Sequence, residues 1–246
     1  MKHSLFMRWL FFHLAMQRGE TMRKILLINP NSSEKMTADI KNTVVQMQLP
    51  DIEITTVKMQ RAPEVLESFG DYTKATYEVM EFLQQIKGYD GILLACFGDP
   101  GLFALKEIAK IPLVGIAEAS FSIAQLLGYK FSVMAASQKA RPMMDQLIKS
   151  YGLENIVTSI ETLNLPIEEF LYNKDLLLDA LLNAGKRAIG RGAEVLIFGC
   201  AGMTMLGDDV QGILGVPVID PIKAGIVTLD AIIRGGFSIS RAGLYA

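Results

Sequence analysis

The fold is decided by two apolar runs that each end in a cysteine, Ile92-Leu93-Leu94-Ala95-Cys96 and Val195-Leu196-Ile197-Phe198-Gly199-Cys200. Runs without polar alternation are typical of strands buried on both faces of a parallel sheet. Each run is followed by a glycine-containing turn, a stretch of helical periodicity and an apolar-Pro-apolar segment. The chain therefore uses one local pattern twice.

The repeat extends upstream of both cysteines. Ile25 begins an apolar run 71 residues before Cys96, and Phe131 begins another 69 residues before Cys200. Self-similarity at a fixed period is the mark of a repeated structural unit. The spacing predicts two copies of one four-strand α/β unit that face each other.

Short β-rich runs alternate with helical periodicity from Met22 onward. Helical spacing predicts one helix over 72–86, ended by Gly88, and another over 177–188 after Asn173. The predicted strands are 24–28, 52–57, 91–95, 113–116, 131–134, 156–160, 195–198 and 216–219. This alternation predicts an α/β protein with parallel sheets.

The first 21 residues differ from the rest and contain the only two histidines, His3 and His13. We expect residues 1–21 to be an extension outside the fold and the working protein to begin near Met22. A histidine triad and a histidine zinc site are then excluded. The predicted domains are 22–117 together with about 222–246, and 118–221.

Composition limits the kinds of partner. The 246 residues are 50% apolar and carry 24 basic against 26 acidic side chains, which gives no basic surface for nucleic acid or anionic lipid. The apolar stretch 5–15 is too short to span a bilayer and has no convincing cleavage site. Two cysteines far apart suggest reduced thiols. We expect a cytoplasmic homo-oligomer that binds a small molecule, with no membrane or nucleic-acid partner.

Cys96 and Cys200 are the main candidates for chemistry. Ligands of open parallel sheets bind beyond the carboxyl ends of the strands, where both cysteines fall. A single cysteine at the end of an apolar strand is usually a buried core residue. Two cysteines at equivalent positions of a repeat favour the interpretation that they form a catalytic pair. The turns after them lead toward helix N-termini, so we expect backbone N–H groups to lower the thiol pKa from ~8.5.

Cofactors have no support in the sequence. Two distant thiols without a histidine provide too few ligands for a zinc site. The sequence also contains no glycine-rich loop of the kind that binds the phosphates of a nucleotide cofactor. We therefore expect neither a metal nor an organic cofactor.

The turn after the first strand carries further polar candidates. Asn31, with Glu34 three residues later, fits a helix N-cap pair. Asn29 lies at the strand end, where its amide is available to hydrogen-bond a polar ligand.

Four strings resemble the hydantoin/allantoin racemases of the Asp/Glu racemase superfamily: 28–33 (Ile-Asn-Pro-Asn-Ser-Ser), 96–102 (Cys-Phe-Gly-Asp-Pro-Gly-Leu), 114–119 (Val-Gly-Ile-Ala-Glu-Ala) and 199–203 (Gly-Cys-Ala-Gly-Met). The resemblance runs from Met22 to about residue 240. It implies two flavodoxin-like domains, a cofactor-independent site in the cleft between them and the two cysteines as its acid/base pair. Amino-acid racemases of the superfamily often carry Thr-His after the second cysteine, whereas Ala201-Gly202 follows here. An amino acid is therefore a less expected substrate.

The resemblance suggests two-base racemisation of a 5-substituted hydantoin or allantoin. Thiolate Cys96 would take the C5 proton from one enantiomer and thiol Cys200 would return one to the opposite face, with the roles reversed for the mirror image. Backbone N–H groups would stabilise the enolate oxygen. The expected substrate contacts are Asn29, Ser33, Phe97, Gly98, Ala201, Gly202 and Met203.

Two other interpretations stay open at this point. One is an isomerase, decarboxylase or amino-acid racemase of the same superfamily that uses a single cysteine. The other is a two-lobed small-molecule binding protein without chemistry, because a fold does not fix a function.

Overall fold

The computed structural model describes residues 22–166, 169 and 172–245. The predicted extension, residues 1–21, lies outside the described residues. The elements in chain order are β1 (Arg23–Asn29), α2 (Glu34–Gln46), β2 (Ile52–Lys58), α3 (Phe69–Leu83), β3 (Gly91–Leu94), α4 (Leu102–Ile108), β4 (Leu113–Gly115), α5 (Ile116–Leu127), β5 (Phe131–Ala135), α6 (Arg141–Ser150), β6 (Val157–Thr162), α8 (Lys174–Gly190), β7 (Val195–Phe198), η1 (Ala201–Met203), α9 (Gly207–Leu214), β8 (Val218–Ile219), α10 (Pro221–Arg234) and η2 (Gly243–Tyr245).

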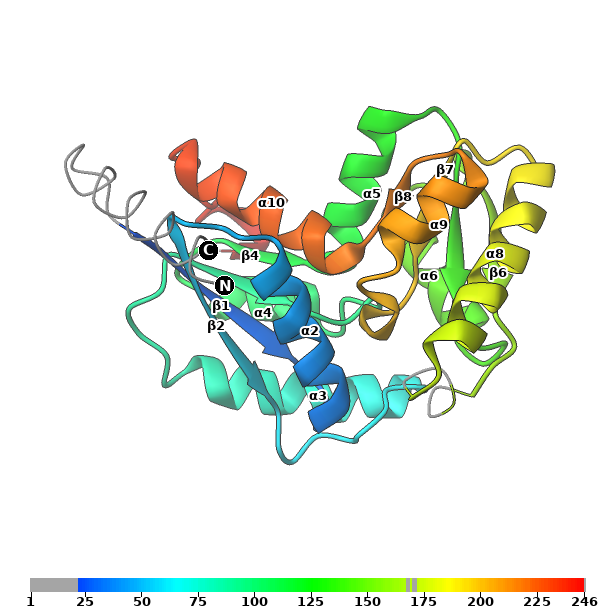
Figure 1. The fold of residues 1–246 in the computed structure, drawn as a ribbon. Coiled ribbons are helices and arrows are strands. Elements are labelled where there is room, and N and C mark those ends of the chain that lie inside the picture. Colours follow the sequence, from blue (N-terminus) through cyan, green and yellow to red (C-terminus); the bar gives the residue numbers. More distant parts are fainter. Residues whose placement is uncertain (1–21, 167–168, 170–171, 246) are drawn as a thin grey trace, which may run out of the picture.

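The eight strands form two parallel sheets of four strands (Figure 1). The strand orders are β2-β1-β3-β4 and β6-β5-β7-β8, so the second sheet repeats the first. Every neighbouring pair is parallel. The predicted α/β fold with two similar four-stranded units is confirmed.

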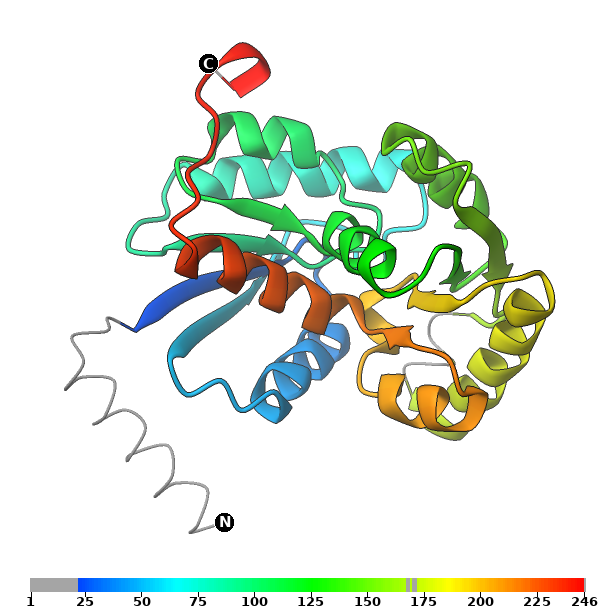
Figure 2. The same ribbon diagram turned by 90° about the horizontal axis from the view of Figure 1, so that it is seen from above.

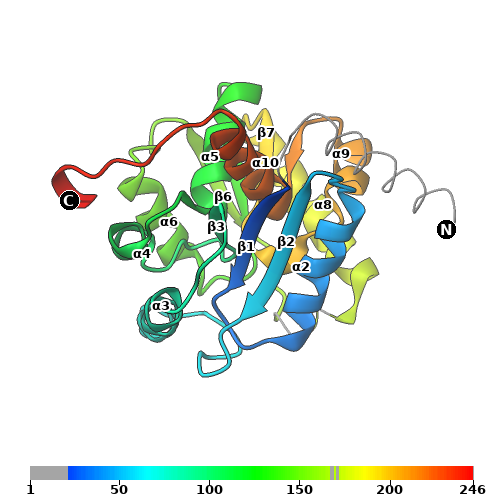
Figure 3. The same cartoon turned by 90° about the vertical axis from the view of Figure 1, so that its left-hand side faces the viewer.

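Helices cover both faces of the first sheet. Figure 3 shows α3 and α4 on one side of its strands and α2 on the other. A smaller hydrophobic cluster lies under α3 and α4 and includes Ile28, Ala75 and Leu105. Residues 25–28 of β1 and all of β3 are buried on both faces, which explains why these two runs are apolar. The edge strand β2 is only partly buried and contains polar residues such as Glu53 and Lys58.

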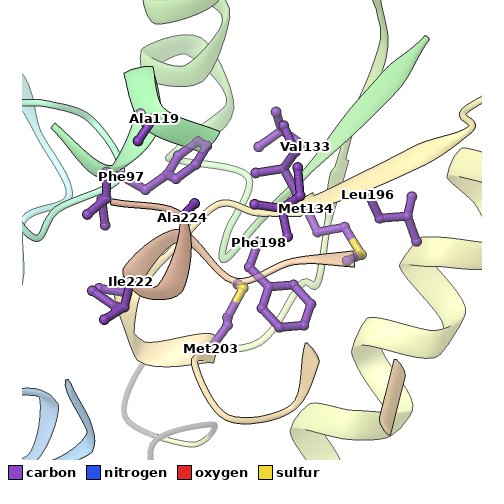
Figure 4. Close-up of a cluster of buried hydrophobic side chains, with 14 of the residues drawn as sticks. Phe97, Ala119, Val133, Met134, Leu196, Phe198, Met203, Ile222 and Ala224 are labelled. Carbon is purple, nitrogen blue, oxygen red and sulfur yellow. The ribbon is translucent and has the colours of Figure 1, made fainter. Parts of the chain in front are cut away.

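The two sheets share one large hydrophobic core. Helices α5 and α10 pack against each other, and each also contacts strands (Figure 2). The core includes Leu27 of the first sheet and Val133 of the second, and Figure 4 shows Val133 and Ile222 of α10 among its members. This shared core holds the two sheets in one arrangement. The assignment of residues 22–117 with 222–246 and of 118–221 to separate domains stays a prediction.

Several predicted boundaries are wrong, and the following three differ most clearly. Helix α3 ends at Leu83, because the N–H of Gln85 bonds to the carbonyl of Phe82 in a tighter turn. Ile116 begins α5 instead of ending a strand, since the Glu118 carboxylate accepts the Gly115 N–H at 3.2 Å and fixes a helix start there. The last strand is only Val218–Ile219.

The prediction after Asn173 is confirmed. Its Oδ1 accepts the N–H of Leu176 at 3.0 Å and caps α8. In the part of the chain that the structure describes, no helix is long and apolar enough to cross a membrane.

Candidate active site

The strand register makes Cys96 and Cys200 structurally equivalent. Ile25 pairs with Gly91 in the first sheet, and Phe131 pairs with Val195 in the second. Each cysteine follows its paired residue, Gly91 or Val195, by five positions. Both are partly exposed, and no disulfide joins them.

Both cysteines line one cavity between the ends of the two sheets. Its wall is mostly apolar and comes from both halves of the chain. The lining residues are Asn31, Met36, Val65, Leu66, Glu67, Tyr72, Ala95, Cys96, Phe97, Ala136, Ser137, Ala140, Met143, Met144, Gly199, Cys200 and Ala201. Glu67 is the one charged residue among them.

A backbone amide contacts each thiol. The N–H of Gly202 donates to Cys200 Sγ at 3.4 Å. Gly98, two residues after Cys96, acts on that thiol in the same way. These amides favour the thiolates, as expected for N–H groups in a turn.

Burial nevertheless dominates the thiol pKa values. It raises the pKa of Cys200 to about 11, while the Gly202 N–H acts in the opposite direction and the charge of Glu67 adds to the rise. Burial also raises the pKa of Cys96, with further contributions from Cys200 and Asp99. The expectation of lowered thiol pKa values is therefore wrong for this structure. The reason is that one N–H does not compensate for the loss of water around each sulfur.

Of the seven expected substrate contacts, Phe97 and Ala201 line the cavity, and the other five do not. Gly98 and Gly202 give their N–H groups to the thiols instead. Met203 is fully buried, and Figure 4 draws it within the hydrophobic core.

The turn after β1 differs from the prediction. Ser33, not Asn31, is the N-cap of α2, and its Oγ accepts the Met36 N–H at 3.3 Å. Asn31 Oδ1 instead accepts the Ser33 N–H at 2.9 Å, which places the cap two residues later. Neither Ser33 nor Asn29 lines the cavity.

Asn29 supports the turn from behind. Its Nδ2 donates to Asn31 Oδ1 at 2.8 Å and to Thr37 Oγ1 at 2.9 Å, so both amide hydrogens are used. The residue is fully buried. Asn29 therefore orients Asn31, which is the residue that reaches the cavity.

Sequence reasoning missed Ser137. Asn31 and Ser137 each follow the equivalent positions Ile25 and Phe131 by six residues, so the repeat contains the signal that would have found both. Ser137 Oγ is buried and has no hydrogen-bond partner among the described residues. An unpaired hydroxyl in a cavity wall is available to a ligand.

Tyr72 was also missed, since only the fold brings α3 to the cavity. Burial raises its pKa, so the hydroxyl is neutral and able to donate. A Cβ on Gly98 would lie 1.9 Å from Tyr72 Oη. Position 98 therefore requires glycine, because any larger side chain would collide with the Tyr72 hydroxyl.

Asp99 anchors the loop that contains Cys96. Its carboxylate accepts the N–H groups of Ala117 at 3.1 Å and Glu118 at 2.9 Å, and the Tyr151 hydroxyl at 2.8 Å. Tyr151 lies at the end of α6, in the second half of the chain. Burial and, next, the charge of Glu118 raise the pKa of Asp99 to about 7. Asp99 thus links the Cys96 loop to the other half of the protein.

No metal-binding cluster is present in residues 22–166, 169 and 172–245. These residues contain no group of three or more His, Cys, Asp or Glu side chains placed to hold an ion.

Comparison with known proteins identifies the family. The family model described as Asp/Glu/Hydantoin racemase matches residues 25–229. The chain belongs to the Asp/Glu/hydantoin racemase family. The match covers both sheets and both cysteines.

Individual members of the family are similar along nearly the whole chain. A hydantoin racemase of Pseudomonas sp. (strain NS671) is 34% identical, covering 90% of each chain. A hydantoin racemase of Paenarthrobacter aurescens is 33% identical, covering 90% of this chain and 96% of the relative. The structure of an allantoin racemase from Klebsiella pneumoniae superposes with a TM-score of 0.86 at 29% identity, covering 91% and 93%. This family member is an isomerase, a racemase.

Proposed function

We propose that this family member is a cofactor-independent racemase of 5-substituted hydantoins or allantoin, with Cys96 and Cys200 as its two acid/base groups. One observation carries the proposal: the register puts the two thiols at equivalent positions of two facing sheets, and both line one cavity. Racemisation removes a proton from one face of a carbon and returns one to the other face, which suits two groups related in this way. The names of the relatives support the substrate class.

The chemistry begins with one thiolate and one thiol. The thiolate takes the C5 proton, the electron pair moves onto the neighbouring carbonyl oxygen, and the thiol on the other face donates a proton to C5. The thiolate has become a thiol and the thiol a thiolate, so the pair is ready for the mirror-image substrate. The N–H groups of Gly98 and Gly202 stabilise whichever sulfur is ionised.

The enolate oxygen needs donors of its own. Among the described residues, no protein acceptor takes the N–H groups of Phe97 and Ala201, and both residues line the cavity. We assign these amides to the developing oxyanion. Asn31 and Ser137 replace Asn29 and Ser33 as the proposed side-chain contacts, because they are the ones that reach the cavity.

Polarimetry of L-5-substituted hydantoins and of one allantoin enantiomer in deuterated water tests the proposal. Decay of the rotation together with deuterium at the reacting carbon is the expected result, and it should survive chelation and dialysis. Static rotation with all of these substrates would refute it and favour a non-catalytic binding protein. Loss of carbon dioxide from a malonate, without racemisation of hydantoins, would favour the single-cysteine alternative.

A further inference from the structure

Glu67 is the one charged side chain in the cavity wall, and its carboxylate has no assigned role. It lies in the loop between β2 and α3, directly before Ser68, the N-cap of α3. Within the described part of the chain, no salt bridge or side-chain hydrogen bond engages this carboxylate. The carboxylate is therefore free to accept hydrogen bonds from a ligand.

The loop around Glu67 is well fixed. The Ser68 Oγ donates to Asp71 Oδ2 at 2.6 Å, and the backbone N–H of Glu67 donates to the same carboxylate at 3.3 Å. The Asp71 N–H returns a bond to Ser68 Oγ at 3.1 Å. One bond thus holds the backbone of Glu67, and two more fix the adjacent Ser68 and Asp71, while the Glu67 side chain stays available. This is expected of a binding residue on a supported loop.

Apart from the two cysteines, the other polar groups of the cavity are neutral. Asn31, Tyr72 and Ser137 contribute amide and hydroxyl groups, and no Lys, Arg or His lines the wall formed by the described residues. A substrate carboxylate would meet no cation there and would be repelled by Glu67. The wall is suited to an uncharged ligand that brings N–H donors.

We propose that Glu67 binds a ureide N–H of the substrate and so selects uncharged cyclic ureides over amino acids and malonates. This inference rests on the proposed function, since it assigns a partner to the ring of the hydantoin. A carboxylate accepts an N–H in a charge-assisted hydrogen bond, which is stronger than one between neutral groups. The glutamate acts on binding and takes no proton from carbon.

The inference is tested with 5,5-dimethylhydantoin, which has no C5 hydrogen and cannot react, and with its two mono-N-methyl derivatives. Calorimetry measures the Kd of each for the wild type, for Glu67→Gln and for the matched control Glu64→Gln, an exposed carboxylate in the same loop. We expect Glu67→Gln to weaken binding of the unmethylated ring by about ten- to a hundredfold, the range for a hydrogen bond to a charged group. One N-methyl derivative should lose this dependence on Glu67, because its donor is gone. Glu64→Gln should change nothing.

Equal weakening of all three ligands, or none, would overturn the assignment, since a purely structural role does not distinguish a methylated nitrogen. Kinetics on a racemising hydantoin give a second measurement. Glu67→Gln should raise KM by about tenfold with kcat changed less than about threefold. A fall of kcat by orders of magnitude at unchanged KM would overturn the binding role. A wild-type protein that neither binds nor racemises any hydantoin would instead refute the proposed function itself.

Discussion

The hydroxyl of Tyr151 donates a 2.8 Å hydrogen bond to the buried carboxylate of Asp99. This bond joins the loop after β3, which contains Cys96, to the end of α6 in the other half of the chain. Because each half supplies one of the two thiols, the contact helps to fix how the thiols face each other. Asp99 also has a left-handed backbone, with φ of 42°, so the loop conformation depends on such contacts.

Tyr151→Phe should destabilise the fold in a pH-dependent way. The pKa of Asp99 is raised to about 7 in the folded protein, above the value in an unfolded chain. Protonation of Asp99 therefore stabilises the fold fully below about pH 4, and this stabilisation is lost as the pH rises through about 7. Without the hydroxyl, the ionised carboxylate loses a donor, which costs about 1–3 kcal/mol. Urea unfolding should show a larger deficit at pH 8 than at pH 5. The control Tyr129→Phe removes an exposed hydroxyl and should show none; an equal deficit at both pH values would contradict the prediction.

The two cysteines should be separately essential but not equivalent. Cys96→Ser or Cys200→Ser removes the acid/base group on one face, since a hydroxyl is far less acidic than a thiol. Each variant should lose racemisation by at least about a hundredfold. In deuterated water, each should still exchange the C5 hydrogen of one enantiomer, and the favoured enantiomer should differ between the variants. If both exchange the same enantiomer, or either racemises normally, one cysteine suffices.

Activity should rise toward alkaline pH. Burial raises the pKa of Cys200 to about 11 and raises that of Cys96 too, so both thiols are protonated at neutral pH. The reaction needs one thiolate, and kcat/KM should increase roughly tenfold per pH unit between pH 7 and 9. Mass spectrometry after alkylation should show both cysteines reacting faster as the pH rises over this range. A pH-independent rate across this range would mean that the thiols are already ionised.

Gly98→Ala should impair the site. The added Cβ would lie 1.9 Å from Tyr72 Oη, and the two atoms cannot coexist without movement of the loop or the ring. Overpacking of this kind costs about 1–3 kcal/mol. We expect reduced unfolding free energy and a loss of racemase activity. Gly190→Ala is the matched control, because nothing lies within 4 Å of its Cβ; loss of activity there as well would remove the explanation.

Ser137→Ala should affect binding without harming the fold. The Oγ is buried and unpaired, so its removal leaves no partner unsatisfied and should keep or slightly raise the unfolding free energy. With substrate, the loss of one neutral hydrogen bond should raise KM by about three- to tenfold. Ser122→Ala, at an exposed position of α5, serves as the control. An unchanged KM would show that substrate does not use this hydroxyl.

The sequence alone determined the approximate positions of the strands, their parallel arrangement and the equivalence of the two cysteines. Buried parallel strands must be apolar on both faces, and this requirement is local, so the runs that end at Cys96 and Cys200 are visible without a structure. The spacing from Ile25 and from Phe131 reflects a strand register that repeats in both sheets. The N-cap of α2 could not be predicted from the sequence, because Asn31 and Ser33 both have side chains suited to capping. Only the backbone geometry shows that Ser33 is the cap.

The tertiary structure decided which side chains reach the cavity and how its groups ionise. Asn29 is turned inward by Asn31 and Thr37, while Glu67 and Ser137, from loops of different halves, meet in one wall. These arrangements depend on how two sheets pack, which no local pattern encodes. The thiol pKa values rise for the same reason. A backbone N–H close to a cysteine in the sequence, which lowers the thiol pKa, can be predicted. The exclusion of water around the sulfur, which raises the thiol pKa, comes from residues distant in the chain. In this protein the exclusion of water has the larger effect.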